Sequence, residues 1–97
     1  MMKMSLDPVI HADARLRIMT ALNAIGEGDS VTFPKLRSIL DITAGNLSVH
    51  LRKLEDAGYI EIEKSFLGRK PLTRARITAS GRTAFTGSLE AIAKLVG

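Results

Sequence analysis

The chain has 97 residues and contains neither cysteine nor tryptophan. The lack of cysteine excludes disulfide bonds, thiolate metal sites and cysteine nucleophiles. No apolar run approaches the length of about 20 residues that spans a bilayer, and no apolar run of about seven residues follows Lys3. We therefore expect neither a membrane span nor a signal peptide, and we expect a cytoplasmic location.

Acidic residues are missing from one part of the chain. Residues 65–89 contain no Asp or Glu, whereas six basic residues lie within residues 64–82. Residues 1–63 hold acids and bases in nearly equal numbers, so the net charge of +4 is concentrated in the C-terminal third. Basic residues clustered without counter-charges indicate a polyanionic partner.

Helical spacing begins near the N-terminus. Asp7 followed by Pro8 predicts a helix start, because a carboxylate caps the free N–H groups and proline has none to lose there. We expect this helix to end before residues 26–30, GEGDS. Its main apolar stripe consists of Ile10, Ala14, Ile18, Ala21 and Leu22. A second strip, which makes the helix apolar on more than one side, consists of Val9, Leu16 and Met19.

A second helix follows a short extended segment at Val31. Thr32 is expected to cap it, with Pro34 in the first turn. The inner face is predicted to consist of Phe33, Leu36, Ile39 and Leu40.

A tight turn at residues 41–43 leads into a third helix, which Thr43 caps and which runs to about Ala57 before Gly58 ends it. The buried stripe of this helix consists of Leu47, Leu51 and Leu54. The opposite face carries small, hydrogen-bonding and basic side chains, namely Gly45, Asn46, Ser48, Val49, Arg52 and Lys53. Such a face fits the major groove of DNA, roughly 12 Å wide, although any solvated helix shows a similar one.

Several of these side chains could contact bases or phosphates in the major groove of DNA. Asn46 can bind adenine through two hydrogen bonds, Arg52 a guanine or a phosphate, and Val49 a thymine methyl group. Gly45 is a poor helix former, and close approach of the backbone to a phosphate would explain its presence.

The next pattern alternates, as is typical of strands. Ile60 and Ile62 alternate with glutamates, and Ala75 and Ile77 alternate with arginines. Residues 68–71, GRKP, have the composition of a turn, so the segment predicts a β-hairpin. A last helix, residues 78–95, has an apolar side that consists of Phe85, Leu89, Ile92 and Val96.

The predicted order is helix, short strand, helix, helix, two-stranded hairpin and C-terminal helix. This mainly α arrangement with a small β-hairpin indicates a winged helix-turn-helix, in which the hairpin is the wing. A chain of this length folds around one modest core, so we expect residues 1–97 to form a single domain.

The wing of such a fold lies beside the third helix, so the two basic elements are expected to face the same way. Arg69 and Lys70 at the tip can reach the DNA backbone or the minor groove, and Lys64 and Arg74 can hold phosphates nearer the base. The release of counterions from those phosphates would drive binding. The alternative is a hairpin that is merely solvated.

Three stretches of the sequence resemble winged-helix transcriptional regulators of the MarR/ArsR type. They are ARLRIMTAL, TAGNLSVHLRKLEDAGYIEIEKSFLGRKP and RITASGRTAF. The resemblance implies a homodimer that binds a palindromic operator in double-stranded DNA and acts as a repressor. It places recognition on the third helix and the wing, at Thr43, Ala44, Gly45, Asn46, Ser48, Val49, Arg52, Arg69 and Lys70.

The chain departs from the metal-sensing members of this group. Such members carry cysteines or clustered histidine and acidic ligands, whereas the two histidines here, His11 and His50, lie on different predicted helices. We interpret His50 as a packing or phosphate-contacting residue, and we expect no metal and no cofactor. We expect no attached effector domain, and nothing in the sequence indicates an effector site.

The terminal helices have more apolar residues than one small core can bury. Such a surplus usually marks an interface, and the alternative is that both strips are needed inside the monomer. The residues expected at a dimer interface are Val9, Leu16, Leu89, Ile92 and Val96.

Two other classes of function fit the sequence less well. An enzyme is not expected, because the chain shows no nucleophile–base pair and no glycine-rich phosphate loop before a helix. A winged helix can instead serve as a protein–protein interaction module without binding DNA, although the third helix and the wing here both keep their basic character. Binding of structured RNA is a weaker alternative, because aromatic residues make up only 4% of the chain.

Overall fold

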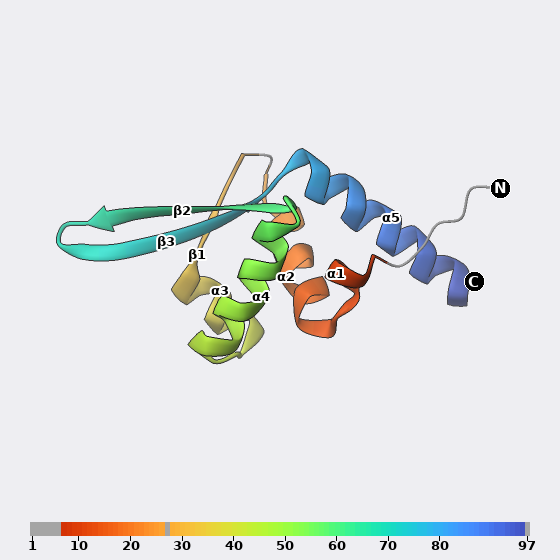
Figure 1. Ribbon diagram of the computed structural model, residues 1–97, viewed down its shortest axis with the longest axis horizontal. Helices are drawn as coiled ribbons and strands as arrows, with labels where there is room; N and C mark the ends of the chain where they lie inside the picture. Colours follow the sequence, from red (N-terminus) through yellow and green to blue (C-terminus); the bar gives the residue numbers. More distant parts are fainter. Residues whose placement is uncertain (1–6, 27, 97) are drawn as a thin grey trace.

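A computed structural model describes residues 7–26 and 28–96. Of residues 1–10, in which no signal peptide is expected, residues 1–6 lie outside the described part of the chain. Along the chain the elements are α1 (Pro8–His11), α2 (Asp13–Ala24), β1 (Val31–Thr32), α3 (Phe33–Leu40), α4 (Ala44–Asp56), β2 (Ile60–Leu67), β3 (Lys70–Ile77) and α5 (Ala79–Val96). The strands form one antiparallel sheet in the order β1-β3-β2. The winged helix-turn-helix prediction is thus confirmed (Figure 1). Within the described ranges, every helix is too short or too polar to cross a membrane.

The first predicted helix is divided into two. Asp7 caps α1 by accepting a hydrogen bond from the Val9 N–H at 2.9 Å, as the sequence indicates. At Ala12, however, the backbone is extended, with φ −60° and ψ 136°, and α2 begins only at Asp13. The prediction of one continuous helix is wrong at this point.

The break explains why the N-terminal segment is apolar on more than one side. Because α1 and α2 have separate axes, residues from both predicted strips can point into the same core. Ile10 and Met19 are completely buried, and Val9 and Leu16 are half-buried against the core of their own chain.

The helix-turn-helix follows the predicted caps. The Thr32 hydroxyl accepts from the Lys35 N–H at 3.3 Å and the Thr43 hydroxyl from the Asn46 N–H at 3.2 Å. Between the helices, the backbone of Asp41 adopts the left-handed helical conformation, with φ 52° and ψ 56°. The assignment of Ile39 to the inner face is wrong, because its side chain is 49% exposed. It lies about 100° of helix rotation from its neighbour Leu40, which is buried.

The wing is longer than predicted. Its strands pair from Ile60↔Ile77 at the base to Leu67↔Lys70 at the tip, and the turn contains only Gly68 and Arg69. Gly68 has φ 65°, which suits glycine. Lys70 and Pro71, expected in the turn, belong to β3.

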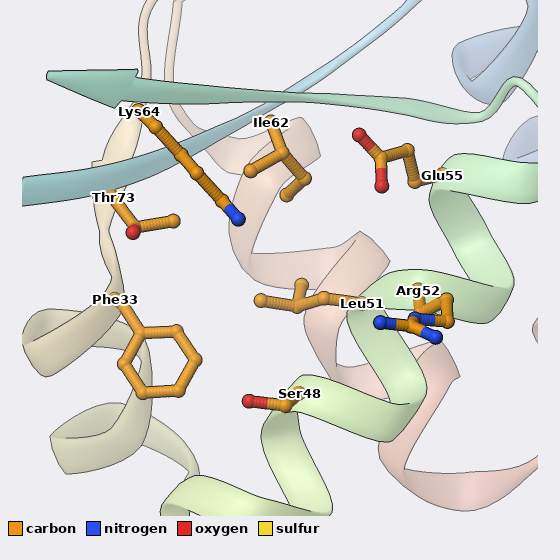
Figure 2. A pocket seen from close by; sticks show the side chains of 8 residues that line it. All are labelled: Phe33, Ser48, Leu51, Arg52, Glu55, Ile62, Lys64 and Thr73. Atoms are coloured by element: carbon orange, nitrogen blue, oxygen red, sulfur yellow. The ribbon is translucent and has the colours of Figure 1, made fainter.

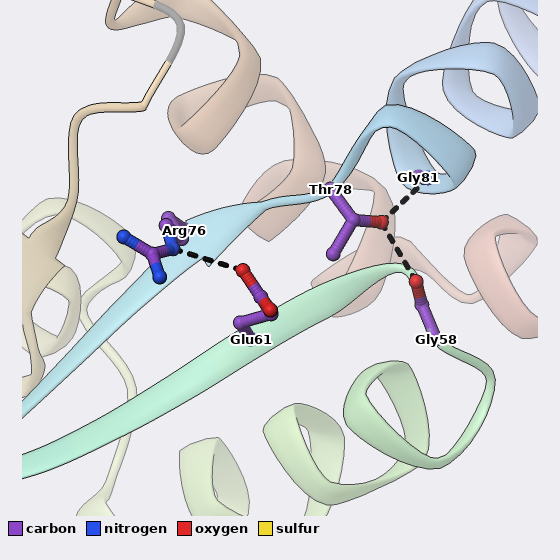
Figure 3. Close-up of polar contacts among 5 residues, drawn as sticks. All are labelled: Gly58, Glu61, Arg76, Thr78 and Gly81. Atoms are coloured by element: carbon purple, nitrogen blue, oxygen red, sulfur yellow. Dashed lines mark hydrogen bonds and ion pairs between the residues drawn. The ribbon is translucent and has the colours of Figure 1, made fainter.

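A set of hydrogen bonds around Thr78 joins the base of the wing to α5 and to the end of α4. The Thr78 hydroxyl donates to the Gly58 carbonyl at 2.7 Å and accepts from the Gly81 N–H at 2.9 Å (Figure 3). The Thr78 N–H donates to the Tyr59 carbonyl at 3.0 Å. This network brings Gly81 against the backbone of Tyr59, where a Cβ atom on residue 81 would lie 2.0 Å from the carbonyl oxygen.

Replacement of Gly81 by alanine is therefore expected to lower the free energy of unfolding by about 2 kcal/mol or more, because the added carbon overlaps a backbone atom. Gly87→Ala in the same helix is the matched control. Its added Cβ meets nothing within 4 Å, so it should stabilise the protein by up to about 1 kcal/mol. Urea unfolding of both variants measures the difference, and equal midpoints for Gly81→Ala and the wild type would contradict the packing described.

Candidate nucleic-acid interface

The outward face of α4 is the one predicted. Leu47, Leu51 and Leu54 are buried, and this packing turns the opposite side of the helix to solvent. The eight predicted positions on that side are all exposed, and they are Thr43, Ala44, Gly45, Asn46, Ser48, Val49, Arg52 and Lys53. A Cβ atom at Gly45 would meet nothing within 4 Å, so packing within the chain does not require glycine there.

The alternation of side chains separates the predicted wing residues into two faces. Directly paired residues in an antiparallel ladder point to the same side. Lys64 pairs with Thr73, and Arg74 pairs with Glu63, the residue next to Lys64. The two cations expected to act together near the base, Lys64 and Arg74, therefore lie on opposite faces of the wing.

A groove of about 320 Å³ separates the wing from the helix-turn-helix. Figure 2 shows the Lys64 side chain reaching from β2 toward α4, which bears Arg52 on the other side of the groove. Apolar side chains from three elements contribute to the lining, together with shorter polar ones. The lining consists of Phe33, Ser48, Leu51, Arg52, Glu55, Ile62, Lys64 and Thr73.

Glu55 is a groove residue that sequence reasoning did not single out. It lies three positions after Arg52 and seven after Ser48, spacings that put the three on one side of a helix. The helical period alone could have identified it. Its carboxylate is exposed and makes the groove less positive than the wing sequence suggests.

The six basic residues within residues 64–82 fall into two groups, those that have a side-chain partner and those that have no ion pair among the described residues. Arg76 forms an ion pair with Glu61 at 2.9 Å (Figure 3), and Arg82 donates to the Asn23 side chain at 3.0 Å. For the other four, no carboxylate within residues 7–26 or 28–96 comes within the 4 Å of an ion pair. These four are the predicted wing contacts, Lys64, Arg69, Lys70 and Arg74.

His50 lies on the side of α4 that faces α2. Its Nδ1 atom is 3.3 Å from Nη1 of Arg15, and because a guanidinium can only donate, Nδ1 accepts and the proton of the neutral ring is on Nε2. Burial, followed by the charges of Arg15 and Lys53, holds the pKa of His50 below its usual value of 6.5. The side chain of His11 lies outside the described residues, and the described part of the chain contains no cluster of three potential metal ligands.

The exposed apolar surface of the terminal helices lies on α5. Leu89 is 45%, Leu95 74% and Val96 86% exposed, and Ile92 is half-buried. Val9 and Leu16 contribute less, because both are packed against the core.

Comparisons with known proteins agree with this geometry. Residues 14–96 match the family model of the winged helix DNA-binding domain. An uncharacterised protein of Methanocaldococcus jannaschii is 32% identical over 87 residues, which cover 90% of this chain and 91% of the relative. A transcriptional regulator homologue from Pyrococcus horikoshii OT3 has the same fold with a TM-score of 0.74 and 32% identity, over 91% of this chain and 87% of that one.

Two more distant structures share the fold. A protein described as a MarR-family transcriptional regulator from Enterococcus faecalis V583 has a TM-score of 0.70 and 22% identity, over 91% of this chain and 73% of that one. PadR of Bacillus subtilis, solved in complex with operator DNA, has a TM-score of 0.62 and 18% identity, over 74% of this chain and 44% of that one. The predicted resemblance to winged-helix transcriptional regulators is confirmed, and the fold is the one shared with the MarR-family structure.

The low pKa of His50 predicts a pH-dependent stability. The His50 ring binds a proton less readily in the folded state than in the unfolded state. The free energy of unfolding should therefore fall as the pH drops below about 6.5, and it should level off below the pKa that His50 has in the folded state. We expect His50→Gln to lose less stability than the wild type between pH 7 and 5.5. NMR titration of the ring measures the pKa directly, and a value at or above 6.5 would contradict the assignment.

Proposed function

Because the match extends over residues 14–96, the chain belongs to the winged helix DNA-binding domain family, and we propose that it binds double-stranded DNA sequence-specifically as a homodimeric transcriptional regulator that acts as a repressor. The observation that carries the proposal is the groove between α4 and the wing, across which Arg52 and Lys64 present cations to the same space. Neither cation forms an ion pair within the described residues.

In the proposed complex α4 enters the major groove. Its exposed face has no aromatic side chain, and Gly45 lets the backbone of the first turn come close to a phosphate. Asn46, Val49 and Arg52 would contact base edges. Thr43, Ala44, Ser48 and Lys53, at the start and along the rim of the face, would position the helix on the backbone.

The wing would bind phosphates with its unpaired cations. Lys64 would hold the backbone beside α4, and Arg69 with Lys70 would reach farther along the duplex. Arg74 faces away from Lys64 and would meet the DNA only where the wing passes between two stretches of backbone. Support also comes from the shared fold of PadR, which was solved on its operator, and from the 32% identity to the regulator homologue of Pyrococcus horikoshii OT3.

A two-fold dimer through α5 would complete the site. The exposed stripe on α5 is apolar over about two turns, and its residues Leu89, Leu95 and Val96 remain exposed to solvent in the part of the chain that the structure describes. Pairing it with a second copy would place two α4 helices about one DNA turn apart, roughly 34 Å, which calls for a palindromic operator. Val9 and Leu16 would add to the edge of this interface.

The salt dependence of DNA binding tests the proposal. Contacts to about eight phosphates per dimer predict a log–log slope near −7. Arg69→Ala should reduce the magnitude of this slope by about one per wing, whereas Arg76→Ala should leave it unchanged, because Glu61 already neutralises Arg76. Fluorescence anisotropy on duplex DNA between 50 and 200 mM salt, about the range over which such contacts respond, measures both.

A slope near zero, or no binding to any duplex, would favour the protein–protein interaction module instead. Equal effects of Arg69→Ala and Arg76→Ala on the slope would show that the division of the wing cations into paired and unpaired ones does not decide which of them bind phosphate.

The dimer has its own test. Leu95→Glu puts a charge into the exposed apolar stripe, while Lys94→Glu puts the same side chain on the opposite side of α5. We expect the wild type and Lys94→Glu to sediment as dimers at micromolar concentration and Leu95→Glu to sediment as a monomer, because burying an unpaired carboxylate is costly. A monomeric wild type would contradict the α5 interface.

A further inference from the structure

Two large apolar side chains lie at the end of the wing, far from the core. Phe66 and Leu67 are each 72% exposed, and they precede the turn at Gly68 directly. Figure 1 shows the wing projecting away from the helices, with its turn at the opposite end of the molecule from the C-terminus of α5. Neither residue is needed to fill the core, since the core cluster contains no wing residue beyond Ile62 and Ala75 toward the tip.

The two side chains point to opposite faces of the wing. Phe66 is four residues from Ile62 and two from Lys64, so it shares the face that turns toward α4. Its partner across the ladder is Pro71, whereas Leu67 pairs with Lys70 on the other face. The face nearest α4 therefore runs from apolar at its base, through Lys64, to an apolar tip.

The wing is long enough to reach from one DNA groove to the next. At about 3.3 Å per residue, Phe66 lies roughly 13 Å farther out than Ile62, and Lys64 lies roughly 7 Å out. The centre of the next minor groove is half a turn, roughly 17 Å, from the centre of the major groove. With α4 in the major groove, Lys64 would lie at the backbone and Phe66 at the next minor groove.

We propose that Phe66 is an apolar wedge that enters this minor groove at a flexible pyrimidine–purine step and helps to select it; the inference rests on the proposed DNA-binding function. Apolar side chains inserted at a base step partly unstack it and bend the duplex. Steps such as TA and CA/TG yield most easily, so the wedge gives sequence preference outside the bases that α4 reads.

The charge around Phe66 favours DNA over a protein partner. Lys64, Arg69 and Lys70 lie within four residues of it, and residues 65–89 contain no acid. None of the three cations is paired with a carboxylate in the described residues. A phosphate backbone on either side of the groove would bind them while the ring occupies the space between.

The test uses the full chain and a duplex selected by the wild type from a random pool. Phe66→Ala should weaken binding about tenfold and reduce the bend measured by fluorescence energy transfer between the duplex ends. The slope of affinity against salt should not change, because no cation is removed. Leu67→Ala is the matched control, equally exposed on the other face, and should bind within about twofold of the wild type. Phe66→Leu, which stays apolar, should retain most of the affinity.

A second measurement couples the residue to the DNA step. Each flexible pyrimidine–purine step that flanks the half-site is changed in turn to a stiffer step. The wild type should lose affinity at one position, and Phe66→Ala should be insensitive to the same change. Such coupling would not arise if Phe66 merely stiffened the wing.

The outcomes separate this inference from the proposed function. A wild type that binds DNA while Phe66→Ala matches it, or while Phe66→Ala and Leu67→Ala lose equally, overturns the wedge alone. A change in sedimentation on Phe66→Ala assigns the residue to a contact between copies and also overturns it. A wild type that binds no duplex overturns both proposals.

Discussion

The burial of Leu47, Leu51 and Leu54 determines how α4 is rotated about its own axis. Each leucine contributes about 1.5–3 kcal/mol when it is removed from water, so a half-turn that exposed all three would cost a large part of the stability of a small domain. The side of the helix offered to a partner is therefore set by the core. The small and basic side chains opposite these leucines face outward for the same reason.

The wing is oriented by a similar constraint at its base. Ile60 and Ile77 are paired and buried, and strand side chains alternate strictly, so every residue out to the tip is assigned to one face or the other. The ion pair of Glu61 with Arg76 neutralises the base of the face turned away from α4. Among the described residues, the cations without an ion pair are Lys64 beside α4, Arg69 and Lys70 at the tip, and Arg74 on the face turned away from α4.

The helices and the wing could largely be predicted from the sequence, because helix caps and the spacing of apolar residues are local signals. Thr43 and the leucine stripe predict α4 and its orientation. The break at Ala12 is less visible, since alanine favours helix, and only the two-sided apolar pattern hinted at it. Ile39 is apolar yet exposed because its angular position, not its hydrophobicity, decides its burial. The separation of Lys64 from Arg74 follows from the alternation itself, because Lys64 shares a face with Ile60 and Ile62, whereas Arg74 alternates with Ala75 and Ile77.

The central claim is that α4 and the wing bind one side of a duplex together, in a major groove and the minor groove next to it. Footprinting with dimethyl sulfate and hydroxyl radicals on a selected operator tests this most directly. We expect protected guanine N7 atoms at the centre of each half-site and protected sugars about half a helical turn away on the same side of the DNA. Major-groove protection with no flanking protection, or protection on opposite sides of the duplex, would contradict it.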